Sequence, residues 1–257
     1  MLDVGFTTEG TKEIQALFGE KIIQFPKPVS LIKTLVRQGA GKKDYILDFF
    51  AGSCTTAQAV LELNREDGGD RHFILVQLPE PTGRPDYPTI AEIGKERVRR
   101  AIKQISRADE GKLPLQAHGS PQDLGFKVFK LGQSNYKPWT GVEDKRPEAY
   151  AHKMELFTDP LVSGWKPENL IWEVAIKEGY GLNARIELIS GIKGHKIYHV
   201  IDPDKGQGFR ICLDDKLDLK ALETLNLSTD DLFICRDAAL NDEAAANLAL
   251  QCRLKTI

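Results

Sequence analysis

The chain has 257 residues, a formal net charge of −2, and 41% hydrophobic and 28% charged residues. This composition is ordinary for a soluble globular protein, and the length suits one large domain or two modest ones. No run of about 18 apolar residues occurs, which excludes a membrane-spanning helix, and the first ten residues do not read as a secretory signal peptide. We therefore expect a cytoplasmic location and no membrane partner.

The near-neutral charge excludes a protein that grips nucleic acid over its whole surface. Proteins that neutralise many phosphates carry a clear excess of Lys and Arg, and this chain has 35 basic against 37 acidic residues. Any contact with DNA is therefore expected to be local, or to come from sequence that is not present here.

Cysteine and histidine give no sign of a metal centre. No two cysteines form a CxxC pair, so buried free thiols are expected at Cys54, Cys212, Cys235 and Cys252. His195 and His199 are four residues apart on one predicted strand, and the sequence shows no carboxylate or cysteine to complete a ligand set. We predict no metal.

The chain begins with two predicted helices. Apolar residues at helical spacing predict a short helix over Thr11 to Phe18. The prolines at 26 and 28 then require an extended loop. Ser30 is the expected N-cap of a second helix, which Gly39 ends.

The next segment has the pattern of a βαβ unit. Residues 45–50 and 73–78 are short apolar runs and predict two buried strands of a parallel sheet, with a helix over 55–64 between them. The whole unit takes about 35 residues, the size of one crossover connection. A long helix over 89–106 follows. We therefore expect an α/β fold with part of a Rossmann-like parallel-sheet core over residues 1–108.

Gly, Pro and charged residues dominate 109–124, which is the predicted linker. Beyond it, residues 125–257 are predicted to form a smaller mixed α/β C-terminal domain. The expected elements there are a strand over 126–129, a helix over 167–178, strands near 184–190, 196–201, 209–212 and 231–235, and helices over 216–225 and 241–252.

The turn after the first strand is the best candidate for a binding site. A strand, a tight glycine turn and a helix start meet there, which brings backbone N–H groups and the positive end of a helix dipole to the carboxyl edge of a parallel sheet. Gly52 leaves room for a ligand near the backbone, and Ser53 and Thr55 offer hydroxyl groups.

The kind of ligand follows from what this turn has and lacks. A dinucleotide site requires G-x-G-x-x-G and a P-loop requires Gly-Lys-Ser/Thr, and neither occurs at the turn. Glu80 follows the second strand, where an acidic group can bind the two hydroxyls of a ribose. Asp48 can pair with an ammonium group. A ribose together with an ammonium describes S-adenosylmethionine better than NAD.

The motifs together are more specific. The segment Phe25-Pro26-Lys27-Pro28-Val29-Ser30, followed by Asp48-Phe49-Phe50-Ala51-Gly52-Ser53 and Thr55-Thr56-Ala57, resembles the amino-methyltransferases of DNA. The chain most resembles the modification subunits of type III restriction–modification systems, which are DNA adenine-N6 methyltransferases. The likeness includes residues 8–13, 93–97, 125–131 and 134–139, and positions near the end, so it extends over nearly the whole chain.

The resemblance implies a role for each of nine residues. Lys27 and Pro28 belong to the loop that closes over the methionine end of the donor, and Asp48 lies near that end. Glu80 binds the ribose. The donor loop itself is made of Phe50, Ala51, Gly52, Ser53 and Thr55. The implied cofactor is S-adenosyl-L-methionine.

The chain departs from the family pattern at Cys54, where the family usually has glycine. Cysteine carries a Cβ atom, so a positive φ would be strained there. Either the turn keeps a negative φ, or donor binding is weakened.

The family's catalytic motif, Asp/Asn-Pro-Pro-Tyr/Phe, does not occur in the sequence. In the family, its polar head and carbonyl bind the adenine amino group and its ring stacks on the flipped base. The nearest matches, at 159–161 and 202–204, lack the second proline and the aromatic residue. We therefore expect no catalytic residue in this chain, which reads as a C-terminal portion or one piece of a split enzyme and is expected to be inactive alone.

Two other hypotheses stay open. The chain is an assembly module whose 125–257 region docks a methyltransferase or restriction subunit while the donor pocket is vestigial, or it methylates RNA or a small molecule. On the first hypothesis, as for the whole enzyme, the expected partners are DNA, through the missing N-terminal part, and a second copy or a restriction subunit.

Overall fold

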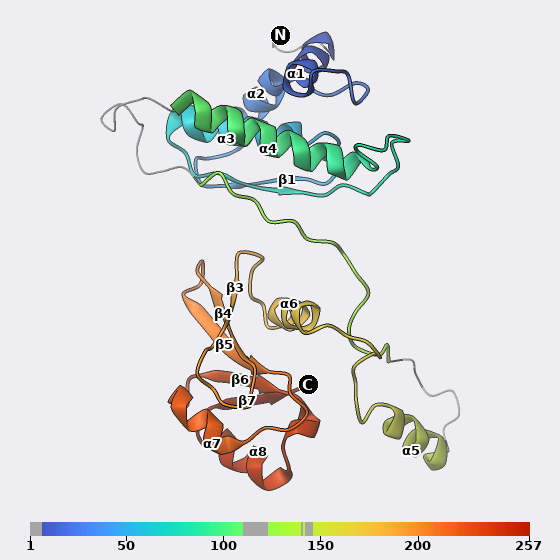
Figure 1. Cartoon of the computed structure of the whole chain (residues 1–257), viewed down its shortest axis with the longest axis vertical. Coiled ribbons are helices and arrows are strands. Elements are labelled where there is room, and N and C mark those ends of the chain that lie inside the picture. Colours follow the sequence, from blue (N-terminus) through green and yellow to red (C-terminus); the bar gives the residue numbers. More distant parts are fainter. Residues whose placement is uncertain (1–6, 110–122, 140, 142–145) are drawn as a thin grey trace. The chain divides into compact units, whose positions relative to one another are not determined.

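The computed structural model describes residues 7–109, 123–139, 141 and 146–257, which form two compact units (Figure 1). Unit 1 ends at Val128 and unit 2 begins at Phe129. Most of the predicted linker, residues 110–122, lies outside the described residues. Residues 125–128 group with unit 1, and the strand predicted over 126–129 is not present. Unit 2 is as long as unit 1, so the expectation of a smaller second domain was wrong.

Unit 1 is built from helices on a short parallel sheet. Its described elements are α1 (Thr7–Phe18), α2 (Val29–Gly39), β1 (Tyr45–Asp48), α3 (Thr55–Asp67), β2 (His72–Leu75) and α4 (Ile90–Asp109). Strands β1 and β2 pair in parallel, with Tyr45 opposite His72 and Asp48 opposite Leu75. Helix α3 is the crossover between them, so the predicted α/β character and the predicted strand–turn–helix–strand unit are both confirmed.

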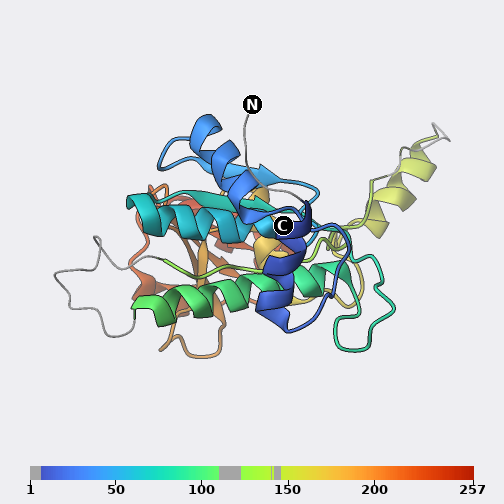
Figure 2. The ribbon, with the colours of Figure 1, turned by 90° about the horizontal axis from the view of Figure 1, so that it is seen from above.

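Helices α3 and α4 cover one face of this sheet (Figures 1 and 2). Most of α3 is buried, from Thr55 to Leu61 without interruption. Leu61, Val98 and Ile105 form a core with Phe73 and Leu75 of β2. A second small core joins Ile14 of α1 and Ile22 to Ile93 of α4. Ile93 therefore packs against α1.

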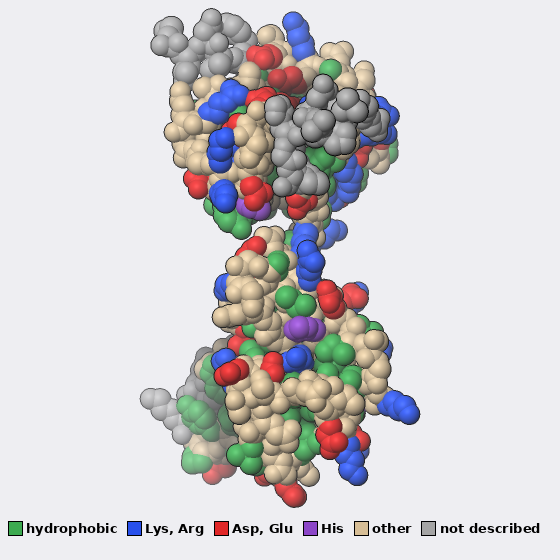
Figure 3. Space-filling model, turned by 90° about the vertical axis from the view of Figure 1, so that its left-hand side faces the viewer, with side chains coloured by type: hydrophobic (Ala, Val, Ile, Leu, Met, Phe, Trp, Pro, Cys, Tyr) green, Lys and Arg blue, Asp and Glu red, His purple; other side chains and the backbone are tan. Residues whose placement is uncertain are grey.

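The opposite face of the sheet is exposed, contrary to the prediction of two buried strands. Both strands alternate between exposed and half-buried residues. The bare face carries Tyr45, Leu47, His72, Ile74, Val76 and Leu78, and the rings of Tyr45 and His72 stack at 4.9 Å. Figure 3 shows hydrophobic side chains beside a histidine at the surface of unit 1. Parallel sheets in proteins normally have both faces covered.

Unit 2 is a mixed sheet with helices. Its described elements are α5 (Pro147–Leu156), α6 (Pro167–Lys177), β3 (Arg185–Leu188), β4 (Ile197–Asp202), β5 (Gln207–Cys212), α7 (Leu219–Leu222), η2 (Glu223–Leu225), β6 (Leu232–Cys235), η3 (Asp237–Ala239), α8 (Asp242–Ala249) and β7 (Arg253–Thr256). The strand order is β3-β4-β5-β6-β7, antiparallel for the first three strands and parallel from β5 to β7.

Four strands and α6 of unit 2 lie where the sequence predicts them. Helix α5 and strand β7 were not predicted, and the expected helix over 241–252 ends at Ala249 because the chain then turns into β7. Across the described ranges of both units, each helix is too short or too polar to form a membrane-spanning segment.

Candidate functional site

The predicted donor turn lies where β1 and β2 both end. Because the strands are parallel and adjacent, their carboxyl ends meet at one edge of the sheet. The backbone ties the two ends together. The Val76 N–H donates to the Asp48 carbonyl at 2.9 Å, and the Ala51 N–H donates to the Val76 carbonyl at 3.1 Å. The turn over 49–54 is therefore held directly against the segment that leads to Glu80.

Asp48 shapes this turn with both of its carboxylate oxygens. Oδ1 accepts a hydrogen bond from the Phe50 N–H at 3.2 Å, and Oδ2 accepts one from the Thr56 hydroxyl at 2.6 Å. An aspartate that bonds the backbone two residues ahead forms an Asx-turn. Asp48 thus links the end of β1 to the first turn of α3, and it remains half exposed.

Gly52 stands at the tip of the turn with a φ of +52°. A Cβ atom built there would meet nothing nearer than the Phe50 carbonyl oxygen at 3.9 Å, so the space beside it is open. Its N–H donates to Oε1 of Gln77 at 2.7 Å. The Nε2 of the same amide lies 3.4 Å from Oε2 of Glu80. Gln77 therefore connects the glycine turn to the predicted ribose-binding acid.

Gln77 was not predicted as a site residue. Its signal was a polar residue in the apolar run Val76-Gln77-Leu78, just beyond the end of β2. A side chain that both accepts and donates is suited to link a backbone N–H to a carboxylate.

The nine predicted residues divide into an exposed and a buried group. Lys27, Phe50 and Glu80 are exposed, and Asp48 and Gly52 are partly exposed. Phe50 is 83% exposed, and its ring lies 5.0 Å from that of Phe49. The buried group comprises Pro28, Ala51, Ser53 and Thr55. A ligand at this edge would therefore meet the first group directly.

Ser53 and Thr55 are both 5% exposed and turn their hydroxyls inward to Arg97 of α4. Nη1 of Arg97 donates to Ser53 Oγ at 2.9 Å and to Thr55 Oγ1 at 2.6 Å, while its Nε donates to Oε1 of Gln58 at 2.8 Å. Arg97 itself is 0% exposed. Burial lowers the pKa of its guanidinium to about 10, so the group stays cationic at neutral pH.

Arg97 is the second residue that sequence reasoning missed, although a signal was present. Ile93, Arg97 and Ala101 are spaced by four residues and therefore share one face of α4. A charged residue inside an apolar stripe is buried with its stripe and needs polar partners there.

Cys54 lies two residues beyond Gly52 and has a φ of +61°, so the first of the two alternatives, a turn that keeps a negative φ, does not hold. Its side chain is buried and points to Gly94 of α4, where a built Cβ would collide with the Cys54 Sγ. Burial raises the pKa of the thiol to about 11. The cysteine therefore lies below the turn and leaves the open space beside Gly52 unfilled.

The segment with Lys27 and Pro28 lies against the same turn. The Thr55 hydroxyl donates to the Lys27 carbonyl at 3.2 Å. Pro28 is the N-cap of α2, which corrects the prediction that Ser30 would cap this helix. Ser30 lies inside the helix, and its Oγ is buried without a hydrogen-bond partner among the described residues.

A hollow of about 580 Å³ opens beside α1, α2 and α3. Its walls include Glu13, Lys33, Arg37, Gln58, Glu62 and Glu66, and none of the nine predicted residues. Lys33 and Arg37 are already paired with Glu62 and Glu66. The hollow therefore does not coincide with the predicted donor site at the sheet edge.

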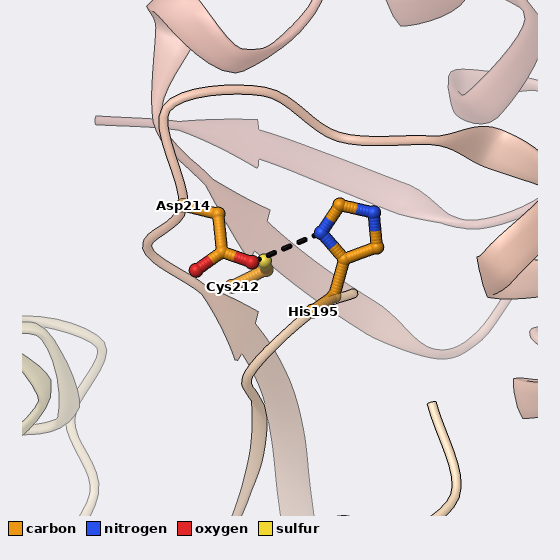
Figure 4. A group of neighbouring side chains, drawn as sticks. All are labelled: His195, Cys212 and Asp214. Atoms are coloured by element: carbon orange, nitrogen blue, oxygen red, sulfur yellow. Dashed lines mark hydrogen bonds and ion pairs between the residues drawn. The ribbon is translucent and has the colours of Figure 1, made fainter. Parts of the chain in front are cut away.

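Among the described residues of unit 2, one group has metal-ligand chemistry. His195, Cys212 and Asp214 place their ligand atoms within 4.8 Å of one another (Figure 4). The expectation that no carboxylate or cysteine would join His195 was wrong. Nδ1 of His195 lies 2.9 Å from Asp214 Oδ2, and its Nε2 accepts a hydrogen bond from the Asp218 N–H at 3.2 Å. Both ring nitrogens are therefore used by hydrogen bonds, which favours a structural role.

Comparison with known proteins connects unit 1 to DNA methylation. Residues 7–105 match a family model described as DNA methylase. The chain is 40% identical over 135 residues to the StyLTI Mod subunit, a type III restriction–modification enzyme of Salmonella typhimurium, which covers 50% of this chain and 20% of that protein. It is 38% identical over 129 residues to the EcoPI Mod subunit of Escherichia phage P1, over 48% and 19%.

A third relative is the type II methyltransferase M.KpnI of Klebsiella pneumoniae, which is 42% identical over 76 residues, 30% of this chain and 18% of that protein. The matched part of the chain spans about a fifth of the length of these curated relatives. The resemblance to modification subunits of type III systems that the sequence predicts is confirmed.

Proposed function

Starting from the kinship of this chain with type III modification subunits, we propose that it is the S-adenosylmethionine-binding part of a site-specific DNA adenine-N6 methyltransferase of a restriction–modification system. The observation that carries the proposal is the path from Gly52 through Gln77 to Glu80 at the carboxyl edge of a parallel strand pair. It places an open glycine turn beside an exposed acid, as an adenosyl ligand requires.

The residues present fit this donor. The space beside Gly52 is open, Cys54 points away from it, and Glu80 is exposed. We propose that Glu80 binds the ribose hydroxyls and that Asp48 attracts the ammonium. Lys27 and Pro28 are proposed to cover the methionine end, and the turn from Phe50 to Thr55 the remainder. When bound, S-adenosylmethionine supplies an electrophilic methyl group on a sulfonium.

We propose that the chain alone transfers no methyl group. No Asp/Asn-Pro-Pro-Tyr/Phe motif occurs in the sequence. Its two nearest matches have other tasks, since Asp159 accepts from the Leu161 N–H and Asp202 is 1% exposed. The Asp202 carboxylate accepts from the N–H groups of Gly181, Asp204 and Lys205, which fixes a turn. Neither aspartate is followed by the second proline and the aromatic residue that the motif requires.

The bare face of the β1–β2 sheet supports the same proposal. A working parallel sheet has both faces covered, so we propose that further polypeptide with the catalytic motif packs there. On this proposal the Rossmann-like core is completed by that polypeptide, and DNA is bound mainly by it. A second copy or a restriction subunit completes the assembly.

Isothermal titration of the full chain with S-adenosylmethionine tests the proposal. We expect saturable heat that is lost in Glu80→Ala and kept in Glu155→Ala, which removes an exposed carboxylate from unit 2. Absence of binding by the unaltered chain would refute the proposed donor site and favour the alternative of an assembly module with a vestigial pocket. Methylation of unmodified DNA by the purified chain would contradict its proposed inactivity.

A further inference from the structure

Helix α1 lies against the backbone of the segment that contains Lys27 and Pro28. A Cβ atom built on Gly10 would collide with the Pro26 carbonyl oxygen and would lie 2.9 Å from the Lys27 carbonyl carbon. Only a glycine allows this approach of the two backbones. The position of α1 therefore sets how far the loop can move in that direction.

Glu13 of α1 holds the next residue of the same segment. Its two carboxylate oxygens lie 3.1 and 3.0 Å from the Val29 N–H, the first backbone N–H of α2. A negative group at a helix N-terminus is favourable because the first N–H groups have no partner within the helix. Glu13 thus anchors α2, and with it Pro28, to α1.

Arg97 joins this anchor to the donor turn. The Nη2 atom of Arg97 lies 3.6 Å from Glu13 Oε2, and this Nη2 has no hydrogen-bond partner among the described residues. Its Nη1 bonds the hydroxyls of Ser53 and Thr55. Since Arg is a donor only, the Thr55 oxygen must accept from it, and the Thr55 hydrogen is directed to the Lys27 carbonyl.

From this continuous path we infer that Arg97 and Glu13 are positioning residues that fix the Lys27–Pro28 segment over the donor turn, without touching the donor. The inference rests on the proposed function. A loop that is already held in its bound position increases the affinity for the ligand, because less conformational entropy is lost on binding. The effect is expected on the part of the donor that this segment covers, its methionine end.

The ligand pair that tests this is S-adenosylmethionine and 5′-methylthioadenosine, which lacks the methionine carbon chain, carboxylate and ammonium. Both are titrated into the full chain and into Arg97→Lys, which keeps the charge but loses the guanidinium fork. Glu13→Gln and Gly10→Ala are the second and third variants. Arg99→Lys, at an exposed position of the same helix, is the matched control.

We expect Arg97→Lys and Glu13→Gln each to lower the affinity for S-adenosylmethionine about tenfold. The affinity for 5′-methylthioadenosine should fall less than about twofold. Gly10→Ala is expected to act in the same direction, and Arg99→Lys to change neither affinity. The double variant Arg97→Lys/Glu13→Gln should lose less binding free energy for S-adenosylmethionine than the sum of the two single losses, because both residues act through one path.

Equal weakening of both ligands would show that Arg97 only supports the fold, and unchanged affinities would show that it does not act on the site. Either result overturns the inference. Failure of the unaltered chain to bind either ligand would instead refute the proposed function. Thermal unfolding of each variant identifies one that does not fold, in which case Glu13→Gln and Gly10→Ala carry the test.

Discussion

The thiol of Cys54 fills the space above Gly94, so the two positions can hold only one side chain between them. Cys54 sits at the N-cap of α3 and Gly94 within α4, which makes their contact part of the packing between these helices. The positive φ of Cys54 and the presence of a glycine at position 94 of α4 are therefore both part of the same helix–helix contact.

Gly94→Ala is expected to lower the melting temperature of unit 1. Overpacking costs about 1–3 kcal/mol, whereas the gain in helix propensity is at most about 1 kcal/mol. The double variant Cys54→Gly/Gly94→Ala should recover the loss, because glycine relieves the positive φ and the new methyl takes the place of the thiol. Thermal and denaturant unfolding of the four proteins measures this coupling. Additive effects in the cycle would contradict the contact.

The bare sheet face predicts an asymmetry between two leucines. Leu47→Thr on the exposed face should change the free energy of unfolding by less than about 0.5 kcal/mol. Leu61→Ala in the core beneath the other face should cost about 2–5 kcal/mol. Leu47→Thr should also reduce concentration-dependent association in light scattering, since it removes apolar surface. A large loss of stability in Leu47→Thr would mean that this face is covered in the isolated chain.

Acid should weaken unit 2 through Glu173. Burial raises its pKa, but hydrogen bonds from Ser134, from the backbone and side chain of Asn135, and from Lys177 outweigh this and lower it to about 2. A carboxyl whose pKa is lower in the folded state stabilises the fold above its ordinary pKa of 4.5. The contribution is lost as the pH falls from there towards 2.

Unfolding by denaturant at several pH values tests this, with Glu173→Gln as the comparison. The stability difference between the two proteins should be constant above about pH 5 and shrink below it. A difference that is the same at pH 3 and pH 7 would show that the four donors do not stabilise the ionised form.

The hydrogen bonds of the group formed by His195, Cys212 and Asp214 predict that zinc does not change the stability of unit 2. To bond Asp214 the His195 ring must carry a proton on Nδ1, and to accept from the Asp218 N–H its Nε2 must carry none. A metal on Nδ1 would reverse both requirements. We expect EDTA and micromolar Zn²⁺ to leave the melting temperature unchanged, and His195→Ala to cost about 1–3 kcal/mol. Stabilisation by Zn²⁺ that disappears in Cys212→Ser would establish a metal site.

The sequence predicted those helices and strands that hydrophobic periodicity and turn residues determine locally. The strand, turn, helix and strand from Tyr45 onward, and α6 with its proline at the first position, follow from periodicity and turn chemistry. Strand β7 did not, because Arg253-Leu254-Lys255-Thr256 is polar and becomes a strand only through its pairing with β6. The same holds for the bare sheet face, since exposure depends on which polypeptide is present to cover it.

The exposed part of the candidate site was predicted from the sequence, and the buried contacts behind it were not. Glu80 and Gly52 were predicted because they follow strands, where ligands bind in parallel sheets, and their role stays a prediction. Arg97 and Glu13 were not, because their partners lie 39 to 44 and 16 positions away in the chain. Ser53 and Thr55 show the reverse case, since their hydroxyls were expected to face a ligand and they face Arg97.

Gln77 imposes a direction on the turn, because only its oxygen can meet the Gly52 N–H and only its nitrogen can meet Glu80. A glutamate in its place would repel the acid, and a lysine would leave the glycine amide without an acceptor. Any engineered exchange of Glu80, the acid that we propose binds the ribose, for a basic group would therefore have to invert this amide as well, and the Gly52 N–H would then lose its acceptor.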